Sequence, residues 1–402
     1  MSDPTKPKRS TSPILKPSQR SGIDNFLVME VMRAAAQEES RGNDVIHMEV
    51  GQPGTPAPRA ARKALEASLN KHALGYTLAT GMSELRERIA QHYADKYNIH
   101  VASRRVIVTS GSSAAFVLAF LAIFDTGDHV ALPTPGYPCY RQILKALGQI
   151  PFELPAREPT QWMPTPQQLL QSLATQNLRG LILASPANPT GTMISRERLN
   201  DLSQACKTNG LWLISDEIYH GLTYGISETC ALETNANAII INSFSKYYSM
   251  TGWRVGWMIV PDILVEPIER LAQNLYISPP AVSQIAALAA FDASEELEAN
   301  KTAYAKNREL LLNELPTVGF TKFAPADGAF YLYCDVSNLA DNSVNLASAI
   351  LKDTAVATTP GVDFDTQNGK AYLRFSYAGT YDHMLEAVTR LKTWSRCRNA
   401  KP

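Results

Sequence analysis

The chain has 402 residues, of which 45% are apolar and 19% charged, and its 38 basic residues balance 38 acidic ones. This composition excludes a chain that is disordered throughout, and zero net charge disfavours nucleic acid or an anionic membrane surface as a partner. The longest apolar run covers residues 114–124, shorter than the ~20 residues that a membrane-spanning helix needs. A length of two to three ordinary domains predicts a two-domain protein and suits an enzyme.

Residues 1–20 are basic and proline-rich, and we predict that they form a mobile N-terminal arm. No apolar segment follows them, so we expect no secretory signal. The five cysteines, at positions 139, 206, 230, 334 and 397, show neither a CxxC pattern nor metal-ligand spacing. We therefore expect reduced thiols, no metal site and a cytoplasmic location.

From about residue 60 to residue 261, short apolar strands alternate with helical stretches. The predicted strands cover residues 105–109, 129–132, 180–184, 211–215, 238–241 and 256–260. Strands that are apolar on both faces and separated by helical lengths favour an α/β domain with a mostly parallel sheet, covered on both sides. In such sheets the ligand lies beyond the carboxyl ends of the strands.

A long helical pattern over residues 295–315 leads into a second region. Its predicted strands are residues 329–334 and 372–376, and its predicted helices are residues 344–351 and 381–396. Strands and helices without strict alternation indicate a smaller α+β domain. We predict a large domain over residues 60–295 and a small domain built from residues 21–59 and 296–402.

The first candidate site segment is Ser-Phe-Ser-Lys, residues 243–246, which follows a buried strand. Burial lowers the pKa of a lysine, and a lowered pKa is what imine formation requires. Ser243, Ser245 and, eight residues after the lysine, Arg254 could surround a phosphate. Taken alone, a lysine in this place is more often an edge residue whose amine reaches water.

Three further segments also follow predicted strands. Asp216 either caps a helix or faces a protonated ring nitrogen, and Tyr219 could offer its phenol to the same ligand. Asn188, in Asn-Pro-Thr-Gly, is either a plain turn residue or a donor to a phenolate oxygen. Residues 109–113, Thr-Ser-Gly-Ser-Ser, form either a simple serine cap or an anion site at a helix start.

One ligand unites these four segments, because a phosphate, a ring nitrogen, a phenolic oxygen and an aldehyde together describe pyridoxal 5′-phosphate (PLP). The order NPTG, D-x-x-Y, S-F-S-K and then Arg also resembles the class I aminotransferases of PLP fold type I, from about residue 21 to residue 392. The resemblance implies a large, mostly parallel α/β domain beside a smaller α+β domain. Four motifs in this order are far more specific than any one of them.

The resemblance implies a role for each matching residue. Lys246 matches the lysine that bonds covalently to PLP, Asp216 the partner of the ring nitrogen, and Asn188 and Tyr219 the ligands of the phenolic oxygen. The implied phosphate contacts are Gly111, Ser112, Ser113, Ser243, Ser245 and Arg254.

The resemblance also implies contacts around the substrate and between subunits. Tyr137 matches the ring that stacks on PLP, Arg374 the arginine that binds the substrate α-carboxylate, and Gly51 a backbone position close to that carboxylate. Tyr76 matches a tyrosine donated to the partner's phosphate site, so a homodimer with shared active sites is expected. A cis Asn188–Pro189 bond is expected as well.

The implied activity is transfer of an amino group from an L-amino acid of aspartate, alanine or aromatic type to a 2-oxo acid, by a ping-pong mechanism. Alternatives on the same scaffold are a carbon–sulfur β-lyase and a cyclopropane-forming synthase. A regulator fused to a DNA-binding domain is disfavoured, because about 20 residues precede the match and the net charge is zero. An inactive homologue is disfavoured because the cofactor-contacting positions are all retained.

The sequence leaves the substrate side chain open. A dicarboxylate substrate needs a second cation, for which Arg141 and Arg20 are only guesses.

Overall fold

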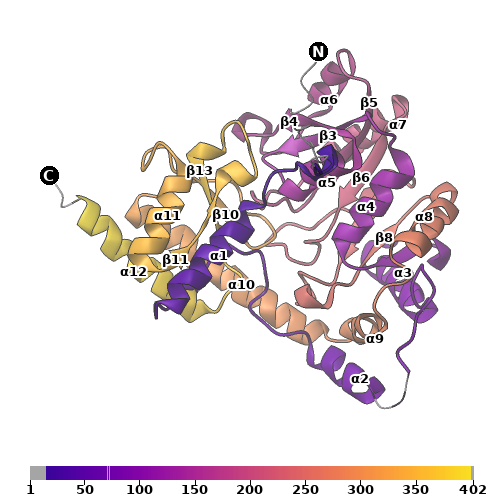
Figure 1. Cartoon of the computed structure of the whole chain (residues 1–402), viewed down its shortest axis with the longest axis horizontal. Coiled ribbons are helices and arrows are strands. Elements are labelled where there is room, and N and C mark those ends of the chain that lie inside the picture. The colour runs from indigo at the N-terminus through magenta and orange to yellow at the C-terminus, as the bar shows by residue number, and fades with distance from the viewer. Residues whose placement is uncertain (1–14, 70, 72, 400–402) are drawn as a thin grey trace, which may run out of the picture.

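The computed structural model describes residues 15–69, 71 and 73–399 (Figure 1). Most of the predicted N-terminal arm, residues 1–14, lies outside the described residues. Residues 15–20 are exposed, and the last two of them begin the short 3₁₀ helix η1 (Gln19–Ser21). Within the part of the chain that the structure describes, no helix combines the length and the apolar character that crossing a bilayer requires.

A seven-stranded sheet forms the centre of the larger part of the molecule (Figure 1). In spatial order its strands are β2 (Val106–Thr109), β8 (Gly256–Ile259), β7 (Ile239–Ser243), β6 (Trp212–Asp216), β5 (Leu178–Ala184), β3 (His129–Thr134) and β4 (Ile150–Pro155). The pairs from β7 through β6, β5 and β3 to β4 are all parallel. This arrangement confirms the predicted mostly parallel α/β sheet.

Two features of the sheet differ from the sequence prediction. Strand β8 runs antiparallel to both of its neighbours, with Val106 opposite Ile259 in β2 and Ser243 opposite Gly256 in β7. Strand β4 was not predicted, because it carries Pro151 and Pro155 and lies at the edge of the sheet, where its residues are largely half-exposed.

Helices cover both faces of this sheet, as the apolar strands predict. On one face of the sheet, the strand residues Val108, Leu181 and Ile240 belong to one apolar core. On the opposite face, Ile182 and Ile241 belong to a second apolar core. The surrounding helices are α2 (Arg59–Leu69), α3 (Ser83–Tyr97), α4 (Ser112–Ile123), α5 (Pro138–Leu147), α6 (Pro166–Leu173), α7 (Arg196–Thr208), α8 (Asp262–Leu275) and α9 (Ala281–Ala290). Consecutive strand residues therefore point into different cores.

The smaller part of the molecule combines segments from both ends of the chain, and Figure 1 shows the indigo helix α1 beside the orange and yellow C-terminal elements. Its helices are α1 (Leu27–Ser40), α10 (Ser294–Glu314), α11 (Ser343–Thr354) and α12 (Tyr381–Asn399). An antiparallel sheet has the order β12 (Thr359–Pro360), β13 (Tyr372–Ser376), β10 (Tyr331–Asp335) and β9 (Lys322–Phe323). A parallel pair, β1 (Ile46–His47) and β11 (Val356–Ala357), joins the N-terminal segment to this part.

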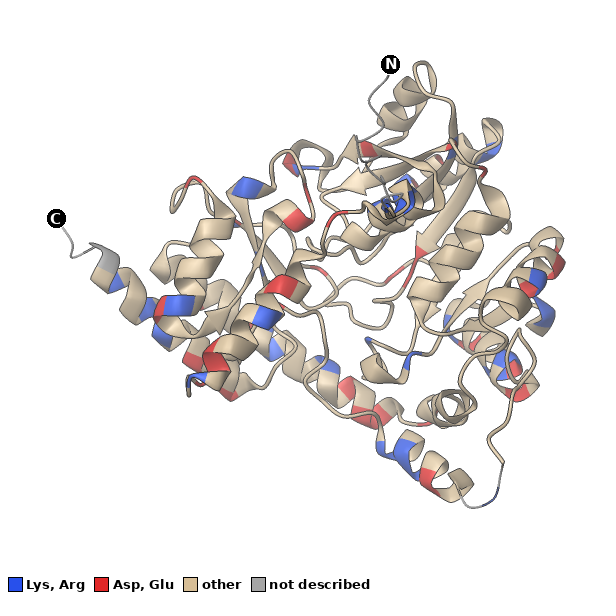
Figure 2. Ribbon diagram, in the orientation of Figure 1, with Lys and Arg blue, Asp and Glu red and all other residues tan. Residues whose placement is uncertain are grey.

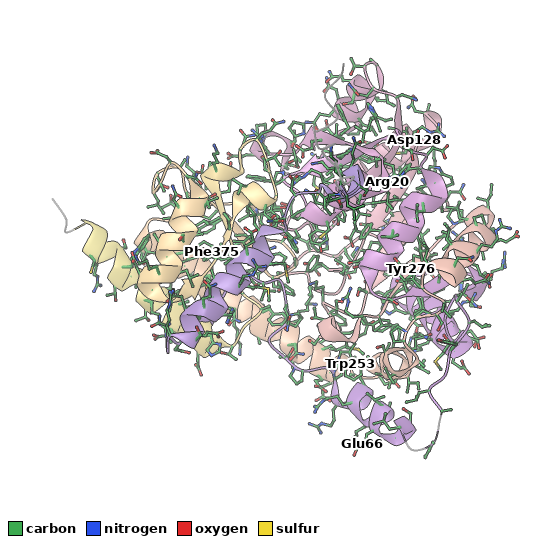
Figure 3. All side chains as sticks on the ribbon, in the orientation of Figure 1. Arg20, Glu66, Asp128, Trp253, Tyr276 and Phe375 are labelled. Carbon is green, nitrogen blue, oxygen red and sulfur yellow. The ribbon has the colours of Figure 1, made fainter. Side chains whose placement is uncertain are left out.

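Short 3₁₀ helices complete the described elements: η2 (Ser103–Arg105), η3 (Glu158–Thr160), η4 (Ala231–Glu233), η5 (Thr251–Trp253), η6 (Leu315–Val318), η7 (Gly361–Asp363) and η8 (Gly369–Ala371). Figure 2 shows charged residues gathered along helices such as α2 and α10, whereas the strands of the central sheet carry few. Side chains from both parts extend into the space that the ribbons leave open between them (Figure 3). The loops that leave the carboxyl ends of the parallel strands face this region.

Candidate active site

A cavity of about 480 Å³ lies where loops of the large sheet meet the smaller part of the molecule. Its volume is in the range that holds a small-molecule ligand. Eleven of the residues singled out from the sequence line it: Gly51, Ser112, Ser113, Tyr137, Asn188, Asp216, Tyr219, Ser245, Lys246, Arg254 and Arg374. These residues are spread over more than 300 positions of the chain, and the fold brings them together.

Three of the singled-out residues do not line this cavity. Gly111 lies directly behind it, at the N-cap of α4. Ser243 is buried behind Ser245, and its hydroxyl donates to the Val255 carbonyl oxygen at 3.0 Å and lies 2.9 Å from the Ser245 hydroxyl. Tyr76 is 84% exposed and contributes nothing to the cavity of its own chain.

The Lys246 amine lies inside the cavity, just beyond the end of β7. Its Nζ donates to the Gly51 carbonyl oxygen at 2.5 Å and lies 5.9 Å from the centre of the Tyr219 ring. Burial and, to a smaller extent, the positive charges of Arg374 and Arg254 together lower the pKa of this amine to about 8, against the opposing effect of Asp216. A substantial neutral fraction is therefore present near neutral pH, as a nucleophilic amine requires.

Asp216 ends strand β6 and is 4% exposed. Its Oδ1 accepts a hydrogen bond from the Ile218 backbone N–H at 3.1 Å, and its Oδ2 accepts one from the Tyr140 hydroxyl. Burial raises the pKa of Asp216 to about 6, while these two donors and the Lys246 charge favour the ionised form. A buried carboxylate with two donors is suited to hold a positively charged N–H group.

The Arg374 guanidinium is buried and also lines the cavity. It donates to Asn188 Oδ1 at 2.8 Å and to Thr359 Oγ1 at 3.3 Å, and it lies 4.3 Å from the centre of the Tyr331 ring. Its buried Nε has no hydrogen-bond partner. A buried donor of this kind suits a carboxylate ligand, and the contact with Asn188 Oδ1 leaves the Asn188 amide nitrogen as a free donor.

The remaining polar residues form an anion cradle at the N-terminus of α4. Gly111 caps this helix with φ +79°, where a side-chain Cβ would lie 2.4 Å from Arg254 Nη2. The Arg254 Nη1 donates to the Thr251 carbonyl oxygen at 3.1 Å. The free N–H groups of a 12-residue helix and the nearby Arg254 guanidinium together attract a phosphate.

The structure also shows the Asn188–Pro189 bond and the two arginines considered for a distal carboxylate. The Asn188–Pro189 bond is cis, which confirms that prediction, and the bonds Thr134–Pro135 and Ser185–Pro186 are cis as well. Neither of the two arginines considered for a distal carboxylate lines the cavity. Arg141 is buried in an ion pair with Glu153 at 3.1 Å, and Arg20 is exposed in η1.

Sequence reasoning missed several residues of the site. Tyr140 follows Tyr137 by one helical turn, so its spacing could have placed it on the same face of α5. Tyr331 is in a predicted strand, and its hydroxyl lies 2.7 Å from the Tyr219 hydroxyl, a contact across 112 positions that no local pattern reveals. The apolar lining residues Phe26, Val28, Met29 and Val50 were also missed.

Comparisons with known proteins identify the family of the chain. Residues 43–391 match the family described as aminotransferase class I and II. A valine–pyruvate aminotransferase of Mycobacterium tuberculosis is 46% identical over 379 residues, which cover 93% of this chain and 97% of that protein.

Two solved structures show the same fold. The crystal structure of an aminotransferase from Mycobacterium tuberculosis has a TM-score of 0.93 at 44% identity, covering 96% of this chain and 100% of that chain. An aspartate aminotransferase from Thermus thermophilus with maleate has a TM-score of 0.89 at 27% identity, covering 94% of this chain and 100% of that chain. The chain therefore belongs to the class I and II aminotransferase family, and it is a PLP-dependent transaminase of fold type I.

Proposed function

We propose that the cavity around Lys246 binds PLP and the amino acid together, with each residue acting as the sequence resemblance implies. The residues fit the cofactor: the amine of Lys246 suits its aldehyde, Asp216 its ring nitrogen, and the cradle at Gly111 and Arg254 its phosphate. The observation that carries this proposal is the convergence of these groups in one cavity. PLP, when bound, supplies a ring that withdraws electrons from the substrate carbon.

The chain's own residues then have distinct tasks. Arg374, with its unpartnered Nε, binds the substrate α-carboxylate, and this contact orients the amino group toward Lys246. Lys246 would be the attachment point of the cofactor, and its amine, once displaced by the substrate amino group, would accept the proton that leaves the substrate Cα. Asp216 holds the proton on the ring nitrogen. Asn188 and Tyr219 donate to the phenolic oxygen.

We further propose that the preferred substrates carry uncharged, apolar side chains. In the described part of the chain, the cations that line the cavity are Lys246, Arg254 and Arg374, and each already has a proposed task. The cavity is also lined by apolar residues at the start of α1 and in the segments beside it: Phe26, Val28, Met29 and Val50. An apolar wall favours an aliphatic or aromatic side chain and leaves a second carboxylate unpaired.

The named relatives support the same choice. The 46% identical relative is named for valine and pyruvate, whereas the aspartate aminotransferase with maleate is only 27% identical. We therefore propose valine as an amino donor and pyruvate as an acceptor.

A panel of amino donors tests this substrate proposal. Valine, leucine, alanine, phenylalanine and aspartate are each assayed with pyruvate and with 2-oxoglutarate, following the absorbance change as the cofactor accepts the amino group. We expect kcat/KM for valine to exceed that for aspartate by about tenfold or more, since an unpaired charge in an apolar site is costly. A preference for aspartate would contradict the proposal. Release of pyruvate and ammonia from a cysteine conjugate without an oxo acid would instead favour the β-lyase alternative.

We also propose that the enzyme is a homodimer in which Tyr76 completes the partner's phosphate site. The exposed apolar side chains Tyr76, Leu78, Tyr276 and Ile277 support this proposal. The Thr77 backbone N–H donates to Ser278 Oγ at 3.4 Å, so the two segments that carry these side chains lie side by side. Such an exposed apolar surface is typical of a contact between subunits.

Two further proposals concern organisation and location. The separate apolar core around Ile46, Phe330 and Trp394 supports a small domain built from residues 21–59 and 296–402, beside a large domain over residues 60–295. Tyr219 and Leu222 extend from the large domain into this core.

We propose a cytoplasmic location, supported by five cysteines that are all free thiols.

A further inference from the structure

The Asp216 carboxylate is held by a tyrosine from a distant part of the chain. Tyr140 lies in α5, 76 positions before Asp216, and donates its hydroxyl hydrogen to Asp216 Oδ2. Asp216 Oδ1 accepts from the Ile218 N–H at 3.1 Å. Both carboxylate oxygens therefore have a protein donor, and the carboxylate also lines the cavity.

The position of the Tyr140 hydroxyl is fixed by packing. The side chain is 1% exposed, and its ring centre lies 4.9 Å from that of Phe116 and 5.3 Å from that of Tyr137. Helix α5 is itself bounded by Pro138 in its first turn and by Gly148 with φ +91° at its C-cap. A rigid aromatic donor loses little freedom when it forms a hydrogen bond, so the contact can set the orientation of the carboxylate.

The charges around this pair determine which group carries the proton. The titratable groups that face Asp216 are Lys246 after β7, the adjacent Glu217, and Tyr137 and Tyr140 at the start of α5. Burial and the neighbouring carboxylate raise the pKa of Tyr140 well above its usual range. Tyr140 therefore keeps its proton, and the hydrogen bond favours the ionised carboxylate.

We infer that Tyr140 is a positioning residue, whose hydroxyl orients Asp216 and keeps it ionised toward the cavity where the cofactor ring nitrogen binds. This inference rests on the proposed role of Asp216. Tyr140 does not line up with any motif that the sequence resemblance assigned. Tyr140 acts through the Asp216 carboxylate, so its loss should weaken cofactor binding. It should leave the contact between Arg374 and the substrate carboxylate unchanged.

The test is Tyr140→Phe, which removes one hydroxyl and keeps the ring. The affinity of the apoenzyme for PLP is measured by equilibrium dialysis between pH 5 and pH 9. In the wild-type protein, affinity should fall as pH drops through about 6, because protonation removes the negative charge of Asp216. In the variant this fall should begin about one pH unit higher, and affinity near neutral pH should be about tenfold weaker, because the carboxylate has lost a donor. We expect kcat to fall by a similar factor while KM for the amino acid stays unchanged.

Two controls separate this effect from a loss of structure. Tyr93→Phe removes another fully buried hydroxyl, which contacts the Trp257 indole at 3.3 Å outside the cavity, and should leave PLP affinity unchanged. Tyr140→Met removes the hydroxyl with a different side chain, so it tests the inference if Tyr140→Phe does not fold. An unchanged pH profile in the folded Tyr140 variants would overturn the inference.

A double-mutant cycle separates the inference from the proposed function. If Tyr140 acts through Asp216, adding Tyr140→Phe to Asp216→Asn should weaken PLP binding no further. Equal effects of Tyr140→Phe in both backgrounds would overturn the inference. An Asp216→Asn variant with wild-type PLP affinity and rate would show that the proposed role of Asp216 itself has failed.

Discussion

The lowered pKa of Lys246 has three causes that act in the same direction. Partial burial disfavours the ammonium form, and the nearby Arg374 and Arg254 repel it, so the pKa is about 8 compared with 10.5 for an unperturbed lysine. Only the neutral amine can attack the cofactor aldehyde. Acidic pH should therefore slow the attachment of PLP.

We predict that the rate at which PLP attaches to the apoenzyme rises about tenfold per pH unit below about pH 8 and becomes constant above it. Stopped-flow absorbance after mixing apoenzyme with PLP measures this rate. A rate that continues to rise through pH 10 would mean that the attacking amine has the pKa of an ordinary exposed lysine.

At Arg374, geometry matters as much as charge. A lysine at this position keeps the positive charge but loses the planar pair of donors that matches a carboxylate. We predict that Arg374→Lys raises KM for both the amino acid and the oxo acid by about 10- to 100-fold, with a smaller change in kcat. Steady-state kinetics measures both constants. Arg141→Lys, at a buried arginine outside the cavity, is the matched control, and KM values that do not change in Arg374→Lys would place the carboxylate elsewhere.

Individual residues differ in how far the sequence predicts them. Lys246, Asp216 and Asn188 lie at or just after strand ends, where each motif alone allows an ordinary structural role but their combination predicts a ligand site, and all three line the cavity. Tyr331 was missed because its position depends on how β10 is placed against the large domain. Ser243 is predicted at the phosphate, but it does not line the cavity, whereas Ser245, whose hydroxyl lies 2.9 Å from that of Ser243, does. A local pattern does not show which hydroxyl of a turn faces the cavity.

At the scale of elements, helix α4 illustrates how a local sequence builds a binding site. Gly111 has φ +79°, which L side chains rarely adopt, and its missing side chain leaves room for the Arg254 guanidinium. The N-terminus of α4 can therefore approach Arg254 closely, as the proposed phosphate site requires.

We predict that Gly111→Ala weakens PLP binding by about tenfold or more, because the new Cβ would lie 2.4 Å from Arg254 Nη2 and displace it. Equilibrium dialysis measures the affinity. Gly225→Ala is the matched control, because Gly225 has nearly the same φ, +77°, with nothing within 4 Å of the added Cβ. Equal losses of PLP affinity in the two variants would show that backbone strain, and not contact with Arg254, causes the effect.

The secondary structure was largely predictable where strands are buried and uniform in character. Strand β13 has the predicted bounds, and α10 differs from the predicted helix by one residue at each end. The direction of β8 was not predictable, because an apolar run of four residues shows the same sequence pattern whether the strand pairs in parallel or antiparallel. Strand β4 was hidden by its prolines, and the two-residue strands of the smaller part are too short to show a period.

At the scale of the whole molecule, the proposed dimer makes each active site depend on two chains. Tyr76 is exposed in its own protomer, so any phosphate contact must be made across the interface. In a heterodimer of a Tyr76→Ala chain and a Lys246→Ala chain, the site that retains Lys246 would receive an intact Tyr76 from its partner.

We predict that coexpressing these two variants with different affinity tags yields a heterodimer that is more active than either variant homodimer, because one of its two sites is fully restored. Purification through both tags followed by a transaminase assay measures the recovery. A heterodimer no more active than the Tyr76→Ala homodimer would show that Tyr76 does not act on the partner's site. A monomer in sedimentation would contradict the dimer itself.

The most direct test of the account is to locate the covalent attachment of PLP. The loaded enzyme is treated with borohydride, which fixes the bond between cofactor and lysine, and is then digested and analysed by mass spectrometry. We predict that the pyridoxyl group is found on Lys246, and that Lys246→Ala loses both the label and the visible absorbance band. A label on another lysine, or none on a protein that keeps its visible band and activity, would contradict it.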